Sequence, residues 1–203
     1  MTTKQMDRFI AHCDKCLGQK NDCVIHPTDI DEFHIDILLY TPTEKYPYWK
    51  MITMGASDYK MPRKNPTIAG RNEYIMLVDK DVDMNDKDVA SWYYQILWMI
   101  ACYSYSNKVH VTYGHSFEWQ NEDEFDEMIA AYLEFPPIFD YEILNYQSGL
   151  FTNVACLLVV LLNKADLDLL MQIGPQRFSE YLSPEDENAP KHFLSEKVRS
   201  EKF

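Results

Sequence analysis

Three cysteines and one histidine near the N-terminus have the spacing that comes closest to a metal site. Cys13 and Cys16 lie three apart on a predicted helix, and Cys23 and His26 repeat that spacing after a short loop. Three thiolates and one imidazole form a set that Zn²⁺ binds tetrahedrally. However, Cys13 and Cys16 also lie on the apolar stripe of the helix, where cysteine packs as a small hydrophobe. The sequence leaves a zinc-stabilised interaction domain open, with core packing as the favoured interpretation.

A histidine and a carboxylate in the next apolar segment offer a second kind of chemistry. His34 and Asp36 lie two apart in a predicted strand, so both side chains point to the same side. Such a pair could act in acid–base catalysis or bind a metal, but neighbours two apart rarely converge without a third group. We therefore interpret the pair as a polar sheet face or a partner contact. The alternative is a small hydrolase or metal-dependent enzyme that uses the pair together with His110 or His115.

The complete motifs of common active sites do not occur in this sequence. Ser57 follows Gly55 in the stretch YWKMITMGASDY, which lacks the second glycine of the G-x-S-x-G serine elbow. Phosphate-binding loops of the types GxxxxGK[ST] and GxGxxG are also missing from the sequence. We predict no catalytic residue, no resident metal and no cofactor.

Two acidic runs, at Asp79–Asp88 and Glu118–Glu127, suggest a surface for a basic partner. The first run fails the pattern of a calcium-binding EF-hand loop, because Met84 and Ala90 stand where Gly and Glu are required. Each run read alone is typical of a solvated turn. Aromatic residues in an acidic rim can nevertheless anchor a protein partner. The predicted partner-binding residues are Asp81, Asp83, Trp119, Glu122, Asp123 and Phe125, with His34 and Asp36 as a further candidate surface.

The elements that must position these residues alternate between helices and strands without a regular βαβ rhythm. This order predicts an α+β fold in which a mixed twisted sheet packs with helices. Val89–Tyr105 is apolar over much of its circumference and predicts a buried helix, with Asp88 as its N-cap. The unbroken run Ala155–Leu162 predicts a central strand. We also predict helices at Thr2–Leu17 and on both sides of Gly174-Pro175, and strands at Cys23–His26, Phe33–Thr41, Tyr48–Gly55, Glu73–Val78, Lys108–Gly114 and Tyr141–Tyr146.

Length and composition limit the classes of protein. The 203 residues suit one domain, 1–203, with a charged tail from about Ser183 that we expect to be partly loose. A net charge of −13 argues against binding to a nucleic-acid backbone or an anionic membrane, and it permits a basic protein partner. The first residues lack the features of a signal peptide, and the cysteine count of 5 is odd. We therefore expect a cytoplasmic protein without a disulfide framework.

The whole-chain order of short motifs resembles the suppressor-of-fused domain family, from about Phe9 to Arg199. Ala56, Pro27 and the absence of a proline from the last strand depart from the family pattern. The cysteines at 13, 16 and 23 are not a family feature. The segments that carry the resemblance are VIHPTDIDEFHIDILLYTPTE, MITMGASDYKM, NEYIMLV, WYYQILWMIACYSYSNKVHVTYGHSF, LEFPPIF, LLVVLLNKADLDLLMQIGPQRFSEYL and FLSEKVRSE.

The resemblance implies a non-enzymatic binding domain. In animals the family is a scaffold that binds and restrains a transcription factor. Short single-domain members resemble bacterial versions linked to polymorphic toxin systems as immunity proteins. For this chain the resemblance implies a binder that neutralises a toxin, and the acidic charge would suit a basic toxin domain. It also implies that the Gly55–Ser57 segment is a structural turn beside the sheet.

Overall fold

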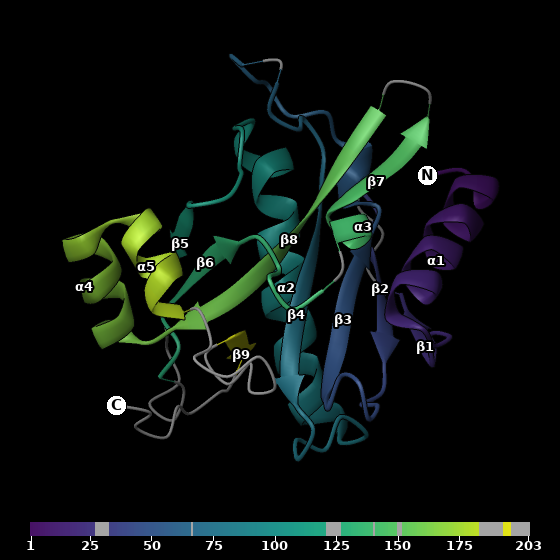
Figure 1. Ribbon diagram of the computed structural model, residues 1–203, viewed down its shortest axis with the longest axis horizontal. Helices are drawn as coiled ribbons and strands as arrows, with labels where there is room; N and C mark the ends of the chain where they lie inside the picture. The colour runs from purple at the N-terminus through teal and green to yellow at the C-terminus, as the bar shows by residue number, and fades with distance from the viewer. Residues whose placement is uncertain are drawn as a thin grey trace.

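The fold is built on one mixed sheet with helices on both faces, shown by the computed structural model in Figure 1. The structure describes residues 1–26, 33–65, 67–120, 127–139, 141–149, 152–182 and 193–195. The strand order is β1-β2-β3-β4-β8-β6-β5, while β7 pairs with β8 and β9 pairs with β4. The strands are β1 (Cys23–Ile25), β2 (Asp36–Tyr40), β3 (Tyr48–Met54), β4 (Asn72–Asp79), β5 (Ser116–Glu118), β6 (Ala130–Glu134), β7 (Asn145–Gly149), β8 (Thr152–Leu162) and β9 (Leu194–Ser195).

The centre of the sheet follows from the apolar run that precedes Asn163. In β8, residues from Val154 to Leu162 alternate between the two faces, and both faces are covered by helices. β8 pairs parallel with β4 and antiparallel with β6. A strand buried on both faces needs apolar side chains at every position. The prediction of a central strand at Ala155–Leu162 is therefore confirmed.

Helices divide the core into two layers. On one face of the sheet lie α1 (Thr3–Leu17), α3 (Tyr141–Leu144), α4 (Lys164–Ile173) and α5 (Pro175–Leu182). On the other lies α2 (Lys87–Asn107), which crosses behind the sheet in Figure 1. None of the helices in the described ranges combines the length and apolar character that crossing a bilayer requires.

The long helix α2 is buried along one stripe. Tyr93, Leu97, Ile100 and Ala101 face the sheet, and several aromatic residues beside them are half-buried. The side chain of Asp86, two residues before the predicted position, accepts hydrogen bonds from the first turn. The prediction of a buried helix is confirmed for this stripe, and the prediction of the cap at Asp88 is wrong.

Two predicted strands are wrong. The segment Tyr141–Tyr146 begins as the short helix α3 before it enters β7. The segment Lys108–Gly114 is a loop that joins α2 to β5, although its residues alternate as a strand would. Asn72 Nδ2 donates to Val111 O at 2.8 Å, His110 Nε2 contacts Ala69 O at 3.0 Å, and the backbone N–H of Gly114 donates to Leu133 O at 2.9 Å.

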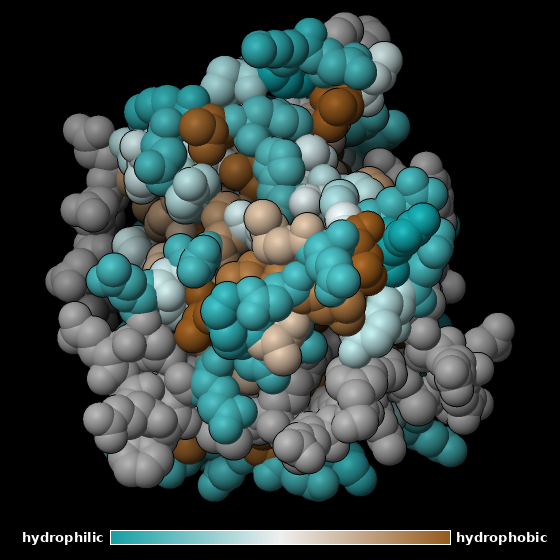
Figure 2. All heavy atoms as spheres, turned by 90° about the vertical axis from the view of Figure 1, so that its left-hand side faces the viewer, coloured by the Kyte–Doolittle hydropathy of each residue, from teal (hydrophilic) through white to brown (hydrophobic). Residues whose placement is uncertain are grey.

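The face that carries α4 and α5 mixes apolar and hydrophilic side chains (Figure 2). Apolar residues gather near the middle of this view, with hydrophilic residues around and across them. Met171 of α4 is 74% exposed and Phe135 after β6 is 48% exposed. Scattered exposure of this kind is normal for a protein surface.

Candidate functional site

The strand directions place the predicted site residues at the two opposite ends of the strands, and we use the word edge for each of these two ends of the sheet. β2 and β4 run parallel to each other, with β3 antiparallel between them. The start of β2, the end of β3 and the start of β4 therefore meet at one edge. We call this the Gly55 edge, and it comprises His26, His34, Asp36, the turn Gly55–Asp58 and Glu73.

The other edge holds the acidic residues. The loop 79–86 follows β4, the loop 41–47 follows β2, and Trp119 follows β5, which runs parallel to β4 through its pairing with β6 and β8. We call this group the Asp81 edge. The two surfaces that the sequence suggested are thus separated by the length of the strands.

At the Gly55 edge, two imidazoles converge on one buried carboxylate. His26 Nδ1 lies 2.7 Å from Asp36 Oδ1, and His34 Nε2 lies 2.6 Å from the same oxygen. The side chain of Asp36 is 1% exposed, whereas those of His26 and His34 are 62% and 40% exposed. His34 and Asp36 therefore converge, and His26 is the third group that sequence analysis did not identify.

The register of the first two strands brings these three residues together. β1 pairs antiparallel with β2 so that Ile25 lies opposite Ile37. One further step along both chains places His26 opposite Asp36. His34 lies in extended backbone two residues before Asp36, and its side chain reaches the same carboxylate. The sequence shows all three residues, but the cross-strand register that joins them cannot be read from spacing alone.

The alternative enzyme that used His110 or His115 is not assembled. Within the described ranges, the one group of three or more candidate metal-ligating side chains is His26, His34 and Asp36. His110 contacts the carbonyl of Ala69, and Nδ1 of His115 lies near the amide of Thr112. Burial lowers the pKa of His115. Neither of these two histidines joins the cluster.

The proposed zinc ligands near the N-terminus are also not brought together. Cys13 and Cys16 are buried in the core under α1, as the packing interpretation predicted, while Cys23 is exposed on β1. Burial raises the pKa of the Cys13 thiol far above its usual value, which disfavours the thiolate that zinc requires. His26 instead contacts Asp36.

The turn after β3 is organised by a buried glutamate. Glu73 Oε1 accepts hydrogen bonds from the backbone N–H groups of Gly55 and Ser57, each at 3.0 Å, and Oε2 accepts from Thr53 Oγ1 at 2.7 Å. Burial raises the pKa of Glu73, and the hydrogen bonds from Ser57, Thr53 and Gly55 oppose that rise. Ser57 therefore serves this carboxylate through its backbone and side chain, which agrees with a structural turn.

Gly55 is required at this turn for a steric reason. Its φ is +122°, and a Cβ at this position would lie 2.5 Å from the backbone oxygen of His34. The turn thus packs closely against the backbone of His34, two residues before β2 begins at Asp36. Any larger residue at position 55 would push that backbone away.

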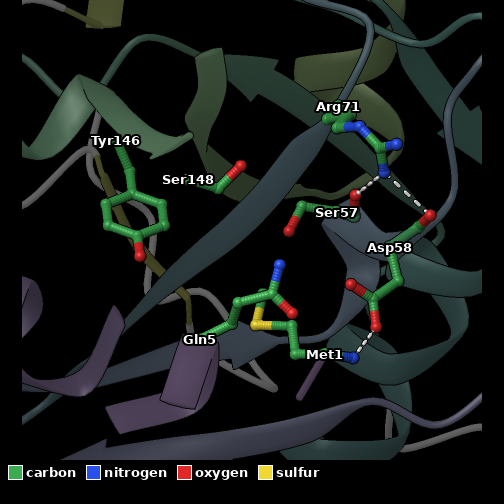
Figure 3. Close-up of a pocket in the computed structure, with 7 residues that line it drawn as sticks. All are labelled: Met1, Gln5, Ser57, Asp58, Arg71, Tyr146 and Ser148. Atoms are coloured by element: carbon green, nitrogen blue, oxygen red, sulfur yellow. Dashed lines mark hydrogen bonds and ion pairs between the residues drawn. The ribbon is translucent and has the colours of Figure 1, made fainter. Parts of the chain in front are cut away.

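A polar cavity of about 250 Å³ lies on the outer side of the same turn (Figure 3). Its lining residues are Met1, Gln5, Ser57, Asp58, Arg71, Tyr146 and Ser148. The Arg71 guanidinium donates to the carbonyls of Ser57 and Asp58, and the amino group of Met1 pairs with the Asp58 carboxylate. Most of the charged groups that Figure 3 draws are therefore engaged with one another.

Stacked aromatic side chains continue the Gly55 edge towards the end of α2. The rings of Phe33 and Tyr105 stack at 4.5 Å, and Tyr59 meets both edge-on. Lys108 Nζ lies 3.9 Å from the centre of the Tyr105 ring. Sequence analysis missed these residues, since Phe33, Tyr59 and Tyr105 belong to different predicted elements and only the fold joins them.

At the Asp81 edge, the acidic side chains mostly serve their own loop. Asp79, Asp83 and Asp86 each accept a hydrogen bond from the backbone N–H two residues later. Asp81 and Asp83 are exposed, while Trp119 is half-buried against the core. The predicted residues Glu122, Asp123 and Phe125 lie outside the described residues. The acidic rim is thus present at Asp81 and Asp83, with Trp119 three strands away from β4 along the sheet.

Comparison with known proteins decides the family. Residues 31–190 match the family model for suppressor of fused protein (SUFU). The chain belongs to the suppressor of fused family. No curated protein matches the chain. The family match includes His34, Asp36, Gly55 and Glu73, whereas His26 precedes it.

Solved structures of the same family share the fold. A SUFU homologue from Neisseria gonorrhoeae FA 1090 has a TM-score of 0.66 at 11% identity, and the match covers 97% of this chain and 96% of that chain. Sufu in the Sufu–Fu complex has a TM-score of 0.70 at 13% identity, covering 97% and 91%. Drosophila Suppressor of Fused has a TM-score of 0.63 at 12% identity, covering 91% of this chain and 48% of that chain. The α+β prediction and the family resemblance are both confirmed.

Proposed function

We propose that this SUFU domain is a non-enzymatic protein-binding module, and that it acts in the cytoplasm as an immunity protein that neutralises a toxin by direct binding. The observation that carries the proposal is the family match over residues 31–190, together with the likeness to Sufu in a structure of the Sufu–Fu complex. Both support a protein as the partner. The net charge of −13 supports a basic one.

The Asp81 edge is the surface that we assign to the approach of this partner. Asp81 and Asp83 project from the loop between β4 and α2 into solvent. Exposed like charges on one rim raise the rate of encounter with an oppositely charged protein more than they raise the lifetime of the complex. Trp119, Glu122, Asp123 and Phe125 complete the proposed contact, and the Gly55 edge around His34 and Asp36 is the second candidate surface.

The function is tested with the product of the gene next to the one that encodes this chain. Co-expression of the two proteins should restore growth that the neighbouring gene product alone inhibits, and the purified proteins should elute as one complex from a sizing column. Growth inhibition that persists in the presence of the folded domain, with no complex on the column, would contradict the proposal.

The contact surface is tested with charge reversal. In Asp81→Lys/Asp83→Lys the association rate with that partner should fall several-fold, and its dependence on salt should weaken, because exposed charges act over about 8 Å at physiological ionic strength. The matched control is Asp7→Lys/Asp168→Lys, which changes the net charge equally on α1 and α4. Equal rates for the two double variants would place the contact elsewhere.

A further inference from the structure

We propose that His26, His34 and Asp36 form a binding site for a divalent first-row transition ion, with Zn²⁺ as the best fit. This inference rests on the Gly55 edge alone and does not depend on the toxin-binding proposal. His26 follows the last residue of β1, His34 lies two residues before β2, and Asp36 is the first residue of β2. The site differs from the cysteine set at 13, 16 and 23 that spacing suggested.

The donor atoms select the class of metal. Two imidazole nitrogens and one carboxylate oxygen suit zinc and its neighbours, and catalytic zinc sites use three protein ligands of this kind. Calcium and magnesium take oxygen ligands almost exclusively. The nitrogen majority in this cluster therefore argues against those two ions.

The geometry needs only a small adjustment to admit an ion. The ligand atoms of the three side chains all lie within 4.8 Å of one another, and both nitrogens are within hydrogen-bonding distance of Asp36 Oδ1. Bonds of roughly 2.0–2.1 Å in tetrahedral geometry would place these atoms about 3.4 Å apart. Because both imidazoles are substantially exposed, they can rotate outward by this amount while the buried carboxylate stays fixed.

An independent observation at Asp36 points to a missing ligand. Its Oδ2 is buried, and among the described residues it has no hydrogen-bond partner. A carboxylate oxygen withdrawn from water without a partner is costly. A cation held by this carboxylate would offset that cost. The two exposed histidines would close over the ion from the solvent side.

The arrangement also leaves room for a fourth ligand. Three protein donors leave a tetrahedral ion one free position. That position would face the solvent, since the rings of His26 and His34 are the exposed members of the cluster. Water or a donor atom from a bound protein can occupy it, and in the latter case the ion would lie at an interface.

The experiment measures metal binding by the untagged full-length chain. Calorimetric titration with ZnCl₂ should give one ion per chain, and Co²⁺ should produce the visible absorption bands of a tetrahedral nitrogen–oxygen site. Saturating Zn²⁺ should raise the melting temperature, because a ligand that binds only the folded state stabilises it. Absence of stoichiometric Zn²⁺ and Co²⁺ binding by the wild-type chain would overturn the proposal.

Variants locate the site. Asp36→Asn keeps the shape of the side chain, and His34→Ala removes a half-exposed ring, so both should fold, as circular dichroism can check. Each should weaken Zn²⁺ binding by more than about 10-fold, which is the smallest loss typical even for an indirect partner of a metal ligand. Each should also abolish the rise in melting temperature.

Two controls separate this site from other donors. Cys23→Ser removes the exposed thiol nearest in sequence to His26, and His115→Ala removes an exposed histidine outside the cluster. Both should bind Zn²⁺ as the wild-type chain does. If Cys23→Ser loses the ion while Asp36→Asn retains it, the ion belongs to the thiol and the proposal is wrong.

Discussion

The two edges of the sheet are each organised by one buried charge, and the charges are of opposite sign. At the Gly55 edge, the Glu73 carboxylate accepts hydrogen bonds from the backbone N–H groups of the turn after β3. At the Asp81 edge, Lys50 Nζ donates to the backbone carbonyls of Thr41 and Tyr46 in the loop before β3. Each charge takes the place of the hydrogen bonds that a strand ladder would have given these backbone groups.

The turn at Gly55 and the acidic loop at the Asp81 edge differ in their backbone conformation and in how their polar groups are satisfied. The turn at Gly55 has a backbone conformation that suits glycine, and it contacts the strand of His34 and Asp36. The acidic loop at the Asp81 edge satisfies its own N–H groups with aspartate side chains and leaves Asp81 exposed. The Gly55 edge thus supports the histidine–aspartate cluster, whereas the Asp81 edge presents exposed charges at Asp81 and Asp83.

Gly55→Ala should cause the largest loss of stability among the variants that compare the two edges. The new Cβ would meet the backbone oxygen of His34 at 2.5 Å, in a conformation that L residues rarely adopt. We expect a loss of about 3 kcal/mol or more in the free energy of unfolding, measured by urea denaturation. The matched control is Gly18→Ala at the end of α1, where φ is +67° and the space is open. It should cost only about 1 kcal/mol, and equal losses in the two variants would show that crowding at Gly55 is unimportant.

Glu73→Gln should have the next largest effect. In the wild-type chain, Thr53 Oγ1 and the backbone N–H groups of Gly55 and Ser57 donate to the two oxygens of the Glu73 carboxylate. In the variant, the glutamine amide has one acceptor oxygen, and its NH₂ group faces donors instead of acceptors. We expect a loss of about 2–3 kcal/mol in the free energy of unfolding. Asp83→Asn at the Asp81 edge is the comparison, since its amide oxygen can still accept from Asn85 N, and its cost should stay below about 0.5 kcal/mol. A small loss in both variants would mean that the turn is held by packing alone.

The sequence predicts the main helices and strands better than the loops and short elements that join them. Apolar periodicity was sufficient to predict α1, α2, β8 and the pair of helices around Gly174, because a buried face leaves its period in the sequence. The segments at 108–114 and 141–146 were wrongly predicted as strands, since Val111 enters the core from a loop and Ile143 enters it from a short helix. Local pattern cannot distinguish these cases from a paired strand.

The candidate site could be predicted only in part. His34 and Asp36 were recognised as a pair from their spacing, but their partner His26 depends on a cross-strand register that local spacing does not encode. The same holds for Glu73, which looks like an ordinary strand residue until the turn at Gly55 is placed beside it. The exposure of Asp81 and Asp83 was easier to anticipate, because a run of charges has few places to lie except in solvent.

The smallest expected effect is a change in the pH dependence of stability, which tests the buried charge of Lys50 at the Asp81 edge. Lys50 is buried beneath the loop 41–47, where its Nζ also bonds to Gln19 Oε1 and lies near the rings of Tyr46 and Tyr48. Burial lowers the pKa of Lys50 to about 8 from its ordinary value of 10.5.

Between these two pKa values the unfolded chain binds more protons at this position than the folded chain does. The contribution of Lys50 to stability therefore rises as the pH increases from about 8 towards 10.5, by at most about 1.4 kcal/mol per pH unit. In Lys50→Met this rise should disappear. Urea denaturation at pH 7.5, 8.5 and 9.5 measures the free energy of unfolding of the wild-type chain and of Lys50→Met. The difference between the two values at each pH isolates Lys50, because the buried tyrosines and cysteines titrate in both proteins. A difference that stays constant with pH would mean that solvent reaches the ammonium group and that this edge is more open than the Gly55 edge.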